Sequence, residues 1–242
     1  MLSMTVHRLL AWSPNFSVSE KSTLSSVDFS VQNSDKYVPT VISAAQSRRL
    51  SDLTKSSVDL ALRLTHDTLV DHVVFSSRHG ELVNATKLLE MIGKNEVLSP
   101  MLFSQSVHNA AIGSYTLLKK NHAATTSLGG GKNSFMMGLV SCAIYLKENP
   151  HAQVLYIAAD ERVPATFENS LREENVPHAA AFLFSNSKNG CELNFSLASG
   201  DGKISRPQNT TPQTLEFLDW FFSPTNSKEL NGEQMTWNLS KC

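Results

Sequence analysis

A run of glycines followed by a long apolar segment most constrains how this chain folds. Three consecutive glycines occupy 129–131, and the apolar residues of 135–146 follow a few positions later. Glycines let backbones approach closely, because no side chain holds them apart. The apolar run shows no alternation and is long enough for a mostly buried helix, which Pro150 follows. The next segment, 154–159, has the continuous apolar pattern of a buried strand. We therefore expect a buried helix and a buried strand in a central layer.

Expected strands and helices alternate along the rest of the chain. Strands are expected at 6–12, 71–76 and 124–128, and helices at 53–69, 84–92 (closed by Gly93), 99–118 and 214–222. The segments 179–185 and 191–199 are expected to pair as a hairpin, and 234–240 to form a last strand. Loops with short helices are expected at 15–37 and 159–171. Because strands and helices alternate, the sequence predicts an α/β layered fold.

Composition and charge exclude several classes of function. The chain has 242 residues, enough for one sizeable domain or two small ones, and its 41% hydrophobic content fits a globular core. The net charge of -1 offers no basic surface for nucleic acid or acidic lipid. No stretch approaches the about 18 uninterrupted apolar residues of a membrane span, and no signal peptide is recognisable. Three cysteines without CxxC spacing favour a reducing compartment, so we expect a cytoplasmic protein.

Several familiar catalytic patterns are incomplete in this sequence. The GGGKNS segment is a poor phosphate loop, because the first glycine of that motif would fall on Thr126 and its hydroxyl on Asn133. Ser106 and His108 do not pair as nucleophile and base if they share a helix, since residues two apart do not face each other. Neither HExxH nor paired-histidine spacing occurs, so we expect no metal and no cofactor.

Two charged segments admit both a structural and a functional interpretation. Arg48 and Arg49 precede an expected helix. A solvated helix entry is the simpler interpretation, and contact with an acidic carrier protein is the alternative. Arg78, His79 and Glu81 look catalytic, but capping and bridging a strand-to-helix turn is the simpler interpretation.

Three motifs carry a resemblance to a known family: SSRHGE at 76–81, SPMLFSQSVHNAAIG at 99–113 and YIAADE at 156–161. Through them the chain resembles the β-ketoacyl synthase-like N-terminal region. More narrowly, it resembles the short chain-length-factor-like subunits that accompany aryl polyene ketosynthases. The resemblance spans about 6–185.

The resemblance implies an α/β, truncated thiolase-like fold that corresponds to the first half of a ketosynthase. We expect a single ketosynthase-like domain over 1–242, with a mixed sheet and a buried central helix. The last residues, 186–242, are expected to form a C-terminal hairpin, helix and tail, and they are not diagnostic of the family.

The resemblance also implies that the family's nucleophile is missing. Family ketosynthases carry a nucleophilic cysteine where a buried helix begins, and two histidines, or a histidine and an asparagine, in their second half. Alignment on Gly138 and the YIAADE strand places that cysteine on or near Gly130. Cys142 lies about three turns further along and cannot replace it. Decarboxylative condensation needs a thiolate and donors for the developing charge, so we expect no catalysis by this chain alone.

By resemblance, the segment 101–113 lies near a subunit interface and projects toward the acyl tunnel of a catalytic partner. The candidate tunnel and interface residues are Phe103, Ser106, Val107, His108, Asn109 and Ala110. Ordinary helix core is the alternative for Phe103 and Val107, and a buried hydrogen-bonded pair is the alternative for His108 and Asn109. Half a thiolase fold would expose a large apolar face, of which the aromatic helix at 214–222 would cover a part. The resemblance therefore implies an obligate heterodimer.

Three functions follow as hypotheses. The first is a non-catalytic, chain-length-factor-like partner of a β-ketoacyl-ACP synthase, which shapes the acyl tunnel in aryl polyene or fatty acid-like biosynthesis. Its partners are a catalytic ketosynthase subunit and an acyl carrier protein with its acyl chain, and nucleic acid and membrane are not among them. The second is an independent acyl-thioester enzyme with another nucleophile, such as Ser127 or Cys142. The third is an acyl-binding scaffold without a ketosynthase partner.

Overall fold

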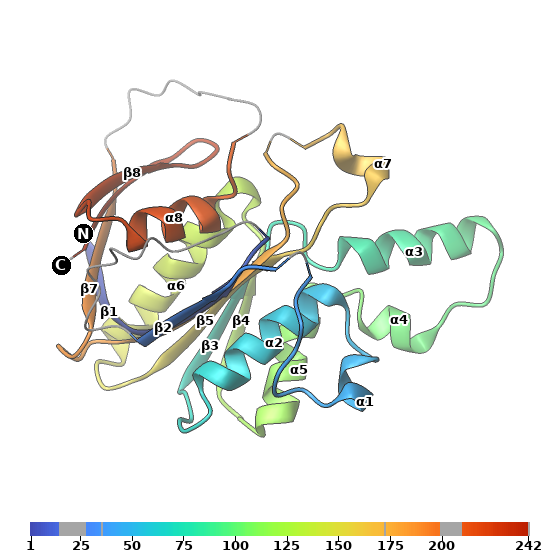
Figure 1. The fold of residues 1–242 in the computed structure, drawn as a ribbon, viewed down its shortest axis with the longest axis horizontal. Helices are drawn as coiled ribbons and strands as arrows, with labels where there is room; N and C mark the ends of the chain where they lie inside the picture. The colour runs from blue at the N-terminus through green and yellow to red at the C-terminus, as the bar shows by residue number, and fades with distance from the viewer. Residues whose placement is uncertain (15–27, 35, 172, 199–209, 242) are drawn as a thin grey trace.

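A mixed sheet forms the centre of the computed structural model of this chain (Figure 1), which describes residues 1–14, 28–34, 36–171, 173–198 and 210–241. The strands are β1 (Leu2–Trp12), β2 (Asp28–Gln32), β3 (His72–Ser76), β4 (Ala124–Leu128), β5 (Val154–Asp160), β6 (His178–Ser185), β7 (Cys191–Leu197), β8 (Ser227–Asn231) and β9 (Thr236–Lys241). The helices are α1 (Ala44–Ser47), α2 (Asp52–Leu64), α3 (Leu82–Gly93), α4 (Pro100–Ser104), α5 (Ala110–Lys119), α6 (Ser134–Glu148), α7 (Ala165–Glu168) and α8 (Gln213–Phe222).

The sheet combines parallel and antiparallel strands. Over the described residues its order is β4-β3-β5-β6-β1-β7-β9-β8, and β2 pairs with β1 as well. β3 runs parallel to both β4 and β5, whereas β6 runs antiparallel to β5 and to β1. The carboxyl ends of β3, β4 and β5 therefore meet at the same edge of the sheet.

Helices cover both faces of the sheet (Figure 1). α2 and α5 pack on one face, and α6 and α8 pack on the other, each pair with its own cluster of buried apolar side chains. β6 is buried along its whole length, and β5 along all of it but its last residue. Such burial is typical of strands that lie between two helical layers.

α6 is the buried helix that the apolar run predicts. Gly138 of α6 faces Tyr156 of β5, and any side chain at this position would overlap the Tyr156 ring. The absence of a side chain lets the helix lie close to the strand. The Tyr156 hydroxyl also donates a hydrogen bond to the Phe135 carbonyl at 2.7 Å, which ties the first turn of α6 to the sheet.

α8 covers a flank of α6 with aromatic side chains. The ring centroid of Phe217 lies 4.8 Å from that of Phe135 in α6 and 5.9 Å from that of Phe182 in β6. The buried Lys241 of β9 donates to two backbone carbonyls in the last turn of α8, at 3.0 and 2.6 Å. A cation at the C-terminal end of a helix satisfies carbonyls that have no partner within the helix. The aromatic helix therefore covers part of the apolar face, as the sequence predicts.

Two predictions about strands are wrong. β6 and β7 do not form a hairpin, because β1 lies between them and pairs with both. Gly190 lies where the connecting turn passes β1, and a side chain here would collide with the Val6 carbonyl. The segment 15–37, expected to be loop with a short helix, contains strand β2, and its residues 15–27 and 35 lie outside the described part of the chain.

Two helix ends also differ from the prediction. α2 ends at Leu64, so Leu69 lies in the following turn with 70% of its surface exposed. Gly93 is the last residue of α3 and does not have positive φ; the chain reverses at Asn95, whose φ is 55°. Asparagine adopts the left-handed conformation more readily than most residues other than glycine, which explains the reversal at this position.

Candidate functional site

The predicted tunnel residues, 103–110, lie where a projecting helical arm returns to the sheet and α5 begins. This α3–α4 arm, residues 82–107, extends to the right in Figure 1. Only Asn84 and Leu88 of α3 are buried, and α4 contains no buried residue. Exposed large apolar side chains gather on the arm: Leu89, Ile92, Val97, Leu98, Met101, Phe103 and Val107. Apolar side chains that cluster on the surface in this way typically mark an interaction site.

The single helix expected over 99–118 is interrupted at 105–109. α4 ends at Ser104, and α5 begins at Ala110. The hydroxyl of Ser104 donates to the Met101 carbonyl at 2.9 Å, and that of Ser106 donates to the Phe103 carbonyl at 2.8 Å. Serine side chains that bond to the nearby backbone compete with helical hydrogen bonds, which explains why the helix stops here.

The interruption changes the surroundings of several candidate residues. Phe103 and Val107 are 62% and 44% exposed, so their interpretation as ordinary helix core is wrong. Ala110 is buried, and Ser106 is half-buried. The predicted buried pair of His108 and Asn109 is also wrong, because Asn109 is exposed and His108 bonds to other groups.

The half-buried His108 ring joins the arm to the ends of β3 and β4. Its Nε2 lies 3.1 Å from the backbone carbonyl of Ser77, and its Nδ1 lies 2.7 Å from the hydroxyl of Ser127. A carbonyl only accepts, so the neutral ring carries its proton on Nε2 and accepts the Ser127 proton on Nδ1. The structure therefore brings together a serine and a histidine that are 19 residues apart in sequence.

The loop after β3 wraps around the carboxylate of Asp160 at the end of β5. Asp160 accepts from the Ser77 hydroxyl at 2.7 Å and from the backbone N–H groups of Arg78 and His79 at 3.1 and 2.9 Å. Sequence patterns alone do not single out Asp160. Asp160 becomes a candidate only from the pairing of β3 and β5, because the carboxyl ends of neighbouring parallel strands meet at one edge of the sheet.

Glu81 and Arg78 have the structural role that the simpler interpretation predicts. The buried Glu81 carboxylate accepts from the hydroxyls of Ser51 and Thr54 at 2.6 and 2.7 Å, which links α3 to the start of α2. Burial raises the pKa of Glu81, and these hydrogen bonds oppose the shift. Arg78 forms an ion pair with Glu173. Glu81 and Arg78 therefore both hold neighbouring segments together.

Gly130, the position assigned to the nucleophile, lies just before α6. A short 3₁₀ turn (Gly131–Asn133) separates it from the helix. The Gly130 N–H donates to the Ser134 hydroxyl at 2.9 Å, and that hydroxyl donates to the Gly131 carbonyl at 2.7 Å. An oxyanion is stabilised by donors that are free to face it. The amide of Gly130 is already paired within the chain, and Gly130 has no side chain to act as a nucleophile.

Cys142 is not placed to replace the missing thiol. Its side chain is fully buried in the third turn of α6, within the apolar cluster that α8 covers. Burial raises the pKa of the Cys142 thiol well above its usual value. A thiol in such surroundings stays protonated and does not react as a nucleophile. The residue is a small core hydrophobe, as its position in the apolar run indicates.

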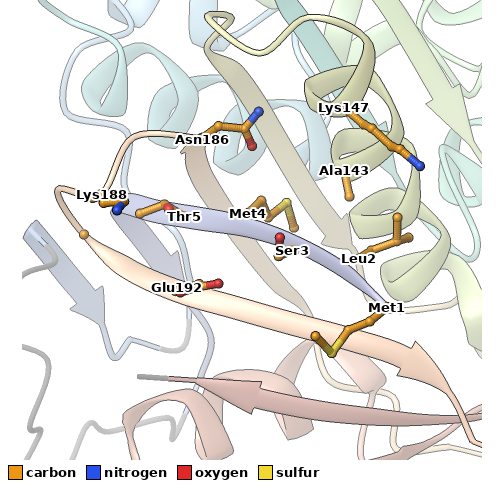
Figure 2. A pocket seen from close by; sticks show the side chains of 11 residues that line it. Met1, Leu2, Ser3, Met4, Thr5, Ala143, Lys147, Asn186, Lys188 and Glu192 are labelled. Carbon is orange, nitrogen blue, oxygen red and sulfur yellow. The ribbon is translucent and has the colours of Figure 1, made fainter.

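A separate cavity of about 840 Å³ opens beside the start of β1 (Figure 2). Residues 1–5 line it together with Ala143 and Lys147 of α6 and the turn between β6 and β7. Lys147 and Lys188 stand on opposite sides of the view in Figure 2. None of the predicted tunnel residues lines this cavity. Within the described ranges, no helix is both long and apolar enough to cross a membrane.

Comparison with known proteins identifies what this arrangement is similar to. The family model "Beta-ketoacyl synthase, N-terminal domain" matches residues 18–240, which extends beyond the range of the three motifs. A solved structure of the ketosynthase (ApeO) in complex with its chain length factor (ApeC) from Xenorhabdus doucetiae contains a similar chain. That chain is 26% identical, with a TM-score of 0.81 over 99% of this chain and 100% of the other.

Two further structures share the fold at lower identity. The ishigamide ketosynthase/chain length factor is 15% identical, with a TM-score of 0.56 over 66% of this chain and 52% of the other. AntDE:AntF, a type II PKS acyl-carrier protein in complex with its ketosynthase, is 12% identical, with a TM-score of 0.66 over 99% of both chains. No protein of curated function matches the sequence. The predicted thiolase-like fold, with its mixed sheet and buried central helix, is confirmed.

Proposed function

The chain belongs to the family of β-ketoacyl synthase N-terminal domains, and we propose that it acts there as a non-catalytic, chain-length-factor-like subunit. One feature of the sequence carries this proposal: alignment on Gly138 and the YIAADE strand puts the family's nucleophile on or near Gly130, which has no side chain. Without a thiolate there is no acyl-enzyme, and without an acyl-enzyme the condensation does not begin. The likeness over the whole chain to a member of the ketosynthase and chain length factor complex supports the same role.

We propose that the obligate partner is a catalytic ketosynthase subunit. Two features of the surface support this partner. The α3–α4 arm exposes seven large apolar side chains, and β4 is the end strand of the sheet, with Ala124 and Thr125 exposed. α6 packs beside β4 and leaves Met137 and Ile144 exposed as well. A free strand edge next to apolar side chains favours pairing with another chain.

The arm then supplies the wall or end of the partner's acyl tunnel. Phe103 and Val107 are its exposed apolar residues closest in sequence to His108, and the hydrogen bonds of His108 fix the base of the arm against β3 and β4. The volume of Phe103 would set how far a growing chain extends. The remaining tunnel candidates are Ser106, Asn109 and Ala110. An aryl polyene or fatty acid-like chain on an acyl carrier protein is the proposed substrate of the complex.

Co-expression with a catalytic ketosynthase subunit from the same organism tests this function. We expect the two chains to purify as a heterodimer that condenses malonyl and acyl groups, with activity that depends on the partner's cysteine alone. Replacing Phe103 by Ala should lengthen the products seen by mass spectrometry. The matched control Leu197→Ala, an exposed residue at the end of β7, should leave product length unchanged. Condensation by this chain alone would refute the proposal.

The contact between His108 and Ser127 favours a second candidate, acyl transfer or hydrolysis with Ser127 as the nucleophile. The histidine is within hydrogen-bond reach of the hydroxyl, and the Ser77 carbonyl orients the ring from its other side. A nucleophile, a base and an orienting group are the parts of a serine hydrolase site. A serine-reactive acyl phosphonate would label Ser127 in this case, and Ser127→Ala would abolish the label. If the histidine only positions the arm, no label forms and Ser127→Ala leaves condensation by the heterodimer intact.

A further inference from the structure

A charged cavity lies at the base of the α3–α4 arm, where the start of α2 meets α3 and α4. Its volume is about 260 Å³. Leu102 and Met101 of α4 form an apolar part of its wall. Its charged lining residues come from distant parts of the sequence: Arg48, Arg49, Asp52, Lys55, Lys87 and Glu161.

The charges around this cavity are mostly positive, although the chain as a whole carries -1. Lys55 pairs with Asp52 at 2.8 Å, whereas Arg48, Arg49 and Lys87 form no ion pair with any residue that the structure describes. Burial, together with the nearby Glu81 and Asp52, raises the pKa of Glu161 to about 8. The Glu161 carboxyl is therefore mostly neutral near pH 7 and does not cancel the three unpaired cations. The positive end of the α2 dipole faces the same region.

Two buried acceptors face no donor here. The side-chain oxygens Gln105 Oε1 and Glu161 Oε1 are buried, and neither has a hydrogen-bond partner. Both residues line the cavity, Gln105 from the end of α4 and Glu161 from the segment after β5. Buried polar atoms in native proteins nearly always have a hydrogen-bond partner. Two acceptors without a partner in one cavity therefore indicate a ligand that supplies hydrogen-bond donors.

We propose that this cavity binds a small phosphate ester whose attached chain carries hydroxyl or amide N–H donors. The phosphate lies among Arg48, Arg49 and Lys87, where guanidinium groups bind phosphate oxygens in pairs. The donor groups reach Gln105 and Glu161. A flat acidic protein surface fits the observations less well, because it would meet the exposed arginines and leave the two buried acceptors unpaired.

Two sources supply this chemistry: a free phosphorylated metabolite, and the phosphopantetheine group of a holo carrier protein. The lining residues all belong to this chain, some of them to the α3–α4 arm, so phosphate binding is measured without a ketosynthase partner and its failure is distinguishable from failure of the proposed function. It assigns Arg48 and Arg49 a phosphate ligand, whereas the sequence suggested a solvated helix entry or contact with an acidic carrier protein.

Isothermal titration of the full chain tests the phosphate part of the proposal. The probes are inorganic phosphate, pantetheine 4′-phosphate and pantetheine. We expect both phosphate probes to bind, pantetheine 4′-phosphate the more tightly, and pantetheine weakly. The double variant Arg49→Gln/Lys87→Gln should weaken both phosphate probes at least about tenfold, because charge-assisted hydrogen bonds are lost. Both residues are exposed, so the fold should persist, and circular dichroism checks it.

The matched control is Lys147→Gln/Lys188→Gln, which removes the same charge beside the other cavity. We expect its affinities to stay within about twofold of the wild type, since long-range screening leaves little effect of remote surface charges. Equal losses in the two double variants would indicate binding to net charge only and would overturn the proposal. So would the absence of binding by both phosphate probes.

Gln105→Leu tests the donor part. This variant should leave the affinity for inorganic phosphate unchanged and remove the advantage of pantetheine 4′-phosphate. Equal affinity of the wild type for the two phosphate probes would overturn the assignment of the acceptors. Competition then identifies the source. If holo but not apo carrier protein displaces the bound probe, the ligand is the prosthetic group; if neither displaces it, the ligand is a free phosphate ester.

Discussion

Replacement of Phe217 by Ala should unfold this chain far more readily than the same replacement at Phe103. Phe217 is fully buried and packs against rings of α6, β6 and α8, whereas Phe103 is 62% exposed on the arm. A buried Phe→Ala change removes the transfer free energy of the ring and leaves a cavity, at a cost of about 3–5 kcal/mol. An exposed one typically changes stability by about 0.5 kcal/mol or less.

This difference in destabilisation is large relative to the total free energy of unfolding. Domains of this kind have unfolding free energies of about 5–15 kcal/mol, so Phe217→Ala removes a third or more of a mid-range value. Equilibrium urea unfolding of the full chain, followed by tryptophan fluorescence, measures it directly, because Trp220 lies 5.6 Å from Phe217 between ring centroids. Losses of equal size in the two variants, or a loss below about 1 kcal/mol at Phe217, would contradict the assignment of α8 as the cover of α6.

Three further predictions concern α6 and the carboxyl edge of the sheet. Gly138→Ala should lower the melting temperature of the chain, because the added methyl group overlaps the Tyr156 ring. This loss should outweigh the helix propensity of Ala, which usually stabilises a helix by about 1 kcal/mol relative to Gly. A rise in melting temperature would contradict the close packing of α6 on β5. Gly130→Cys should fold normally, since a Cβ at this position meets Met137 and Ser134 at an ordinary contact distance of 3.5 Å. This variant should not restore condensation to a heterodimer whose ketosynthase partner lacks its own cysteine. Glu161 has its pKa raised to about 8 in the folded state, so it binds a proton more tightly folded than unfolded. Stability should therefore fall as the pH rises from about 5 to 8, by up to about 1.4 kcal/mol per unit, and Glu161→Gln should flatten this dependence in urea titrations.

Periodicity in the sequence predicted the elements whose partners are apolar. The buried α6, the strand β5 and the aromatic α8 each depend on a continuous or amphipathic apolar pattern, and each lies within two residues of its expected bounds. The cap of α2 by Ser51 was predictable for a local reason, because a serine side chain bonds to an amide three residues on.

The sequence predictions were wrong where a residue distant in sequence determined the local structure. β6 and β7 look like a hairpin in sequence, but β1, the first strand of the chain, pairs with both. The helix expected over 99–118 stops because serine side chains compete for its backbone and His108 bonds to β3 and β4. The position of Asp160 became informative only once β3 and β5 were known to be neighbours.

The cover of α6 also has a consequence for synthesis of the chain. α8, β8 and β9, residues 213–241, follow α6 and β7 in the chain and therefore leave the ribosome after them. Until then the flank of α6 that holds Phe135 has no aromatic partner from α8, and β7 has no neighbour in β9. Nascent chains with uncovered apolar helices and open strand edges are bound by chaperones or aggregate. The emergence of residues 213–241 during translation is thus the step that covers α6 and pairs β7.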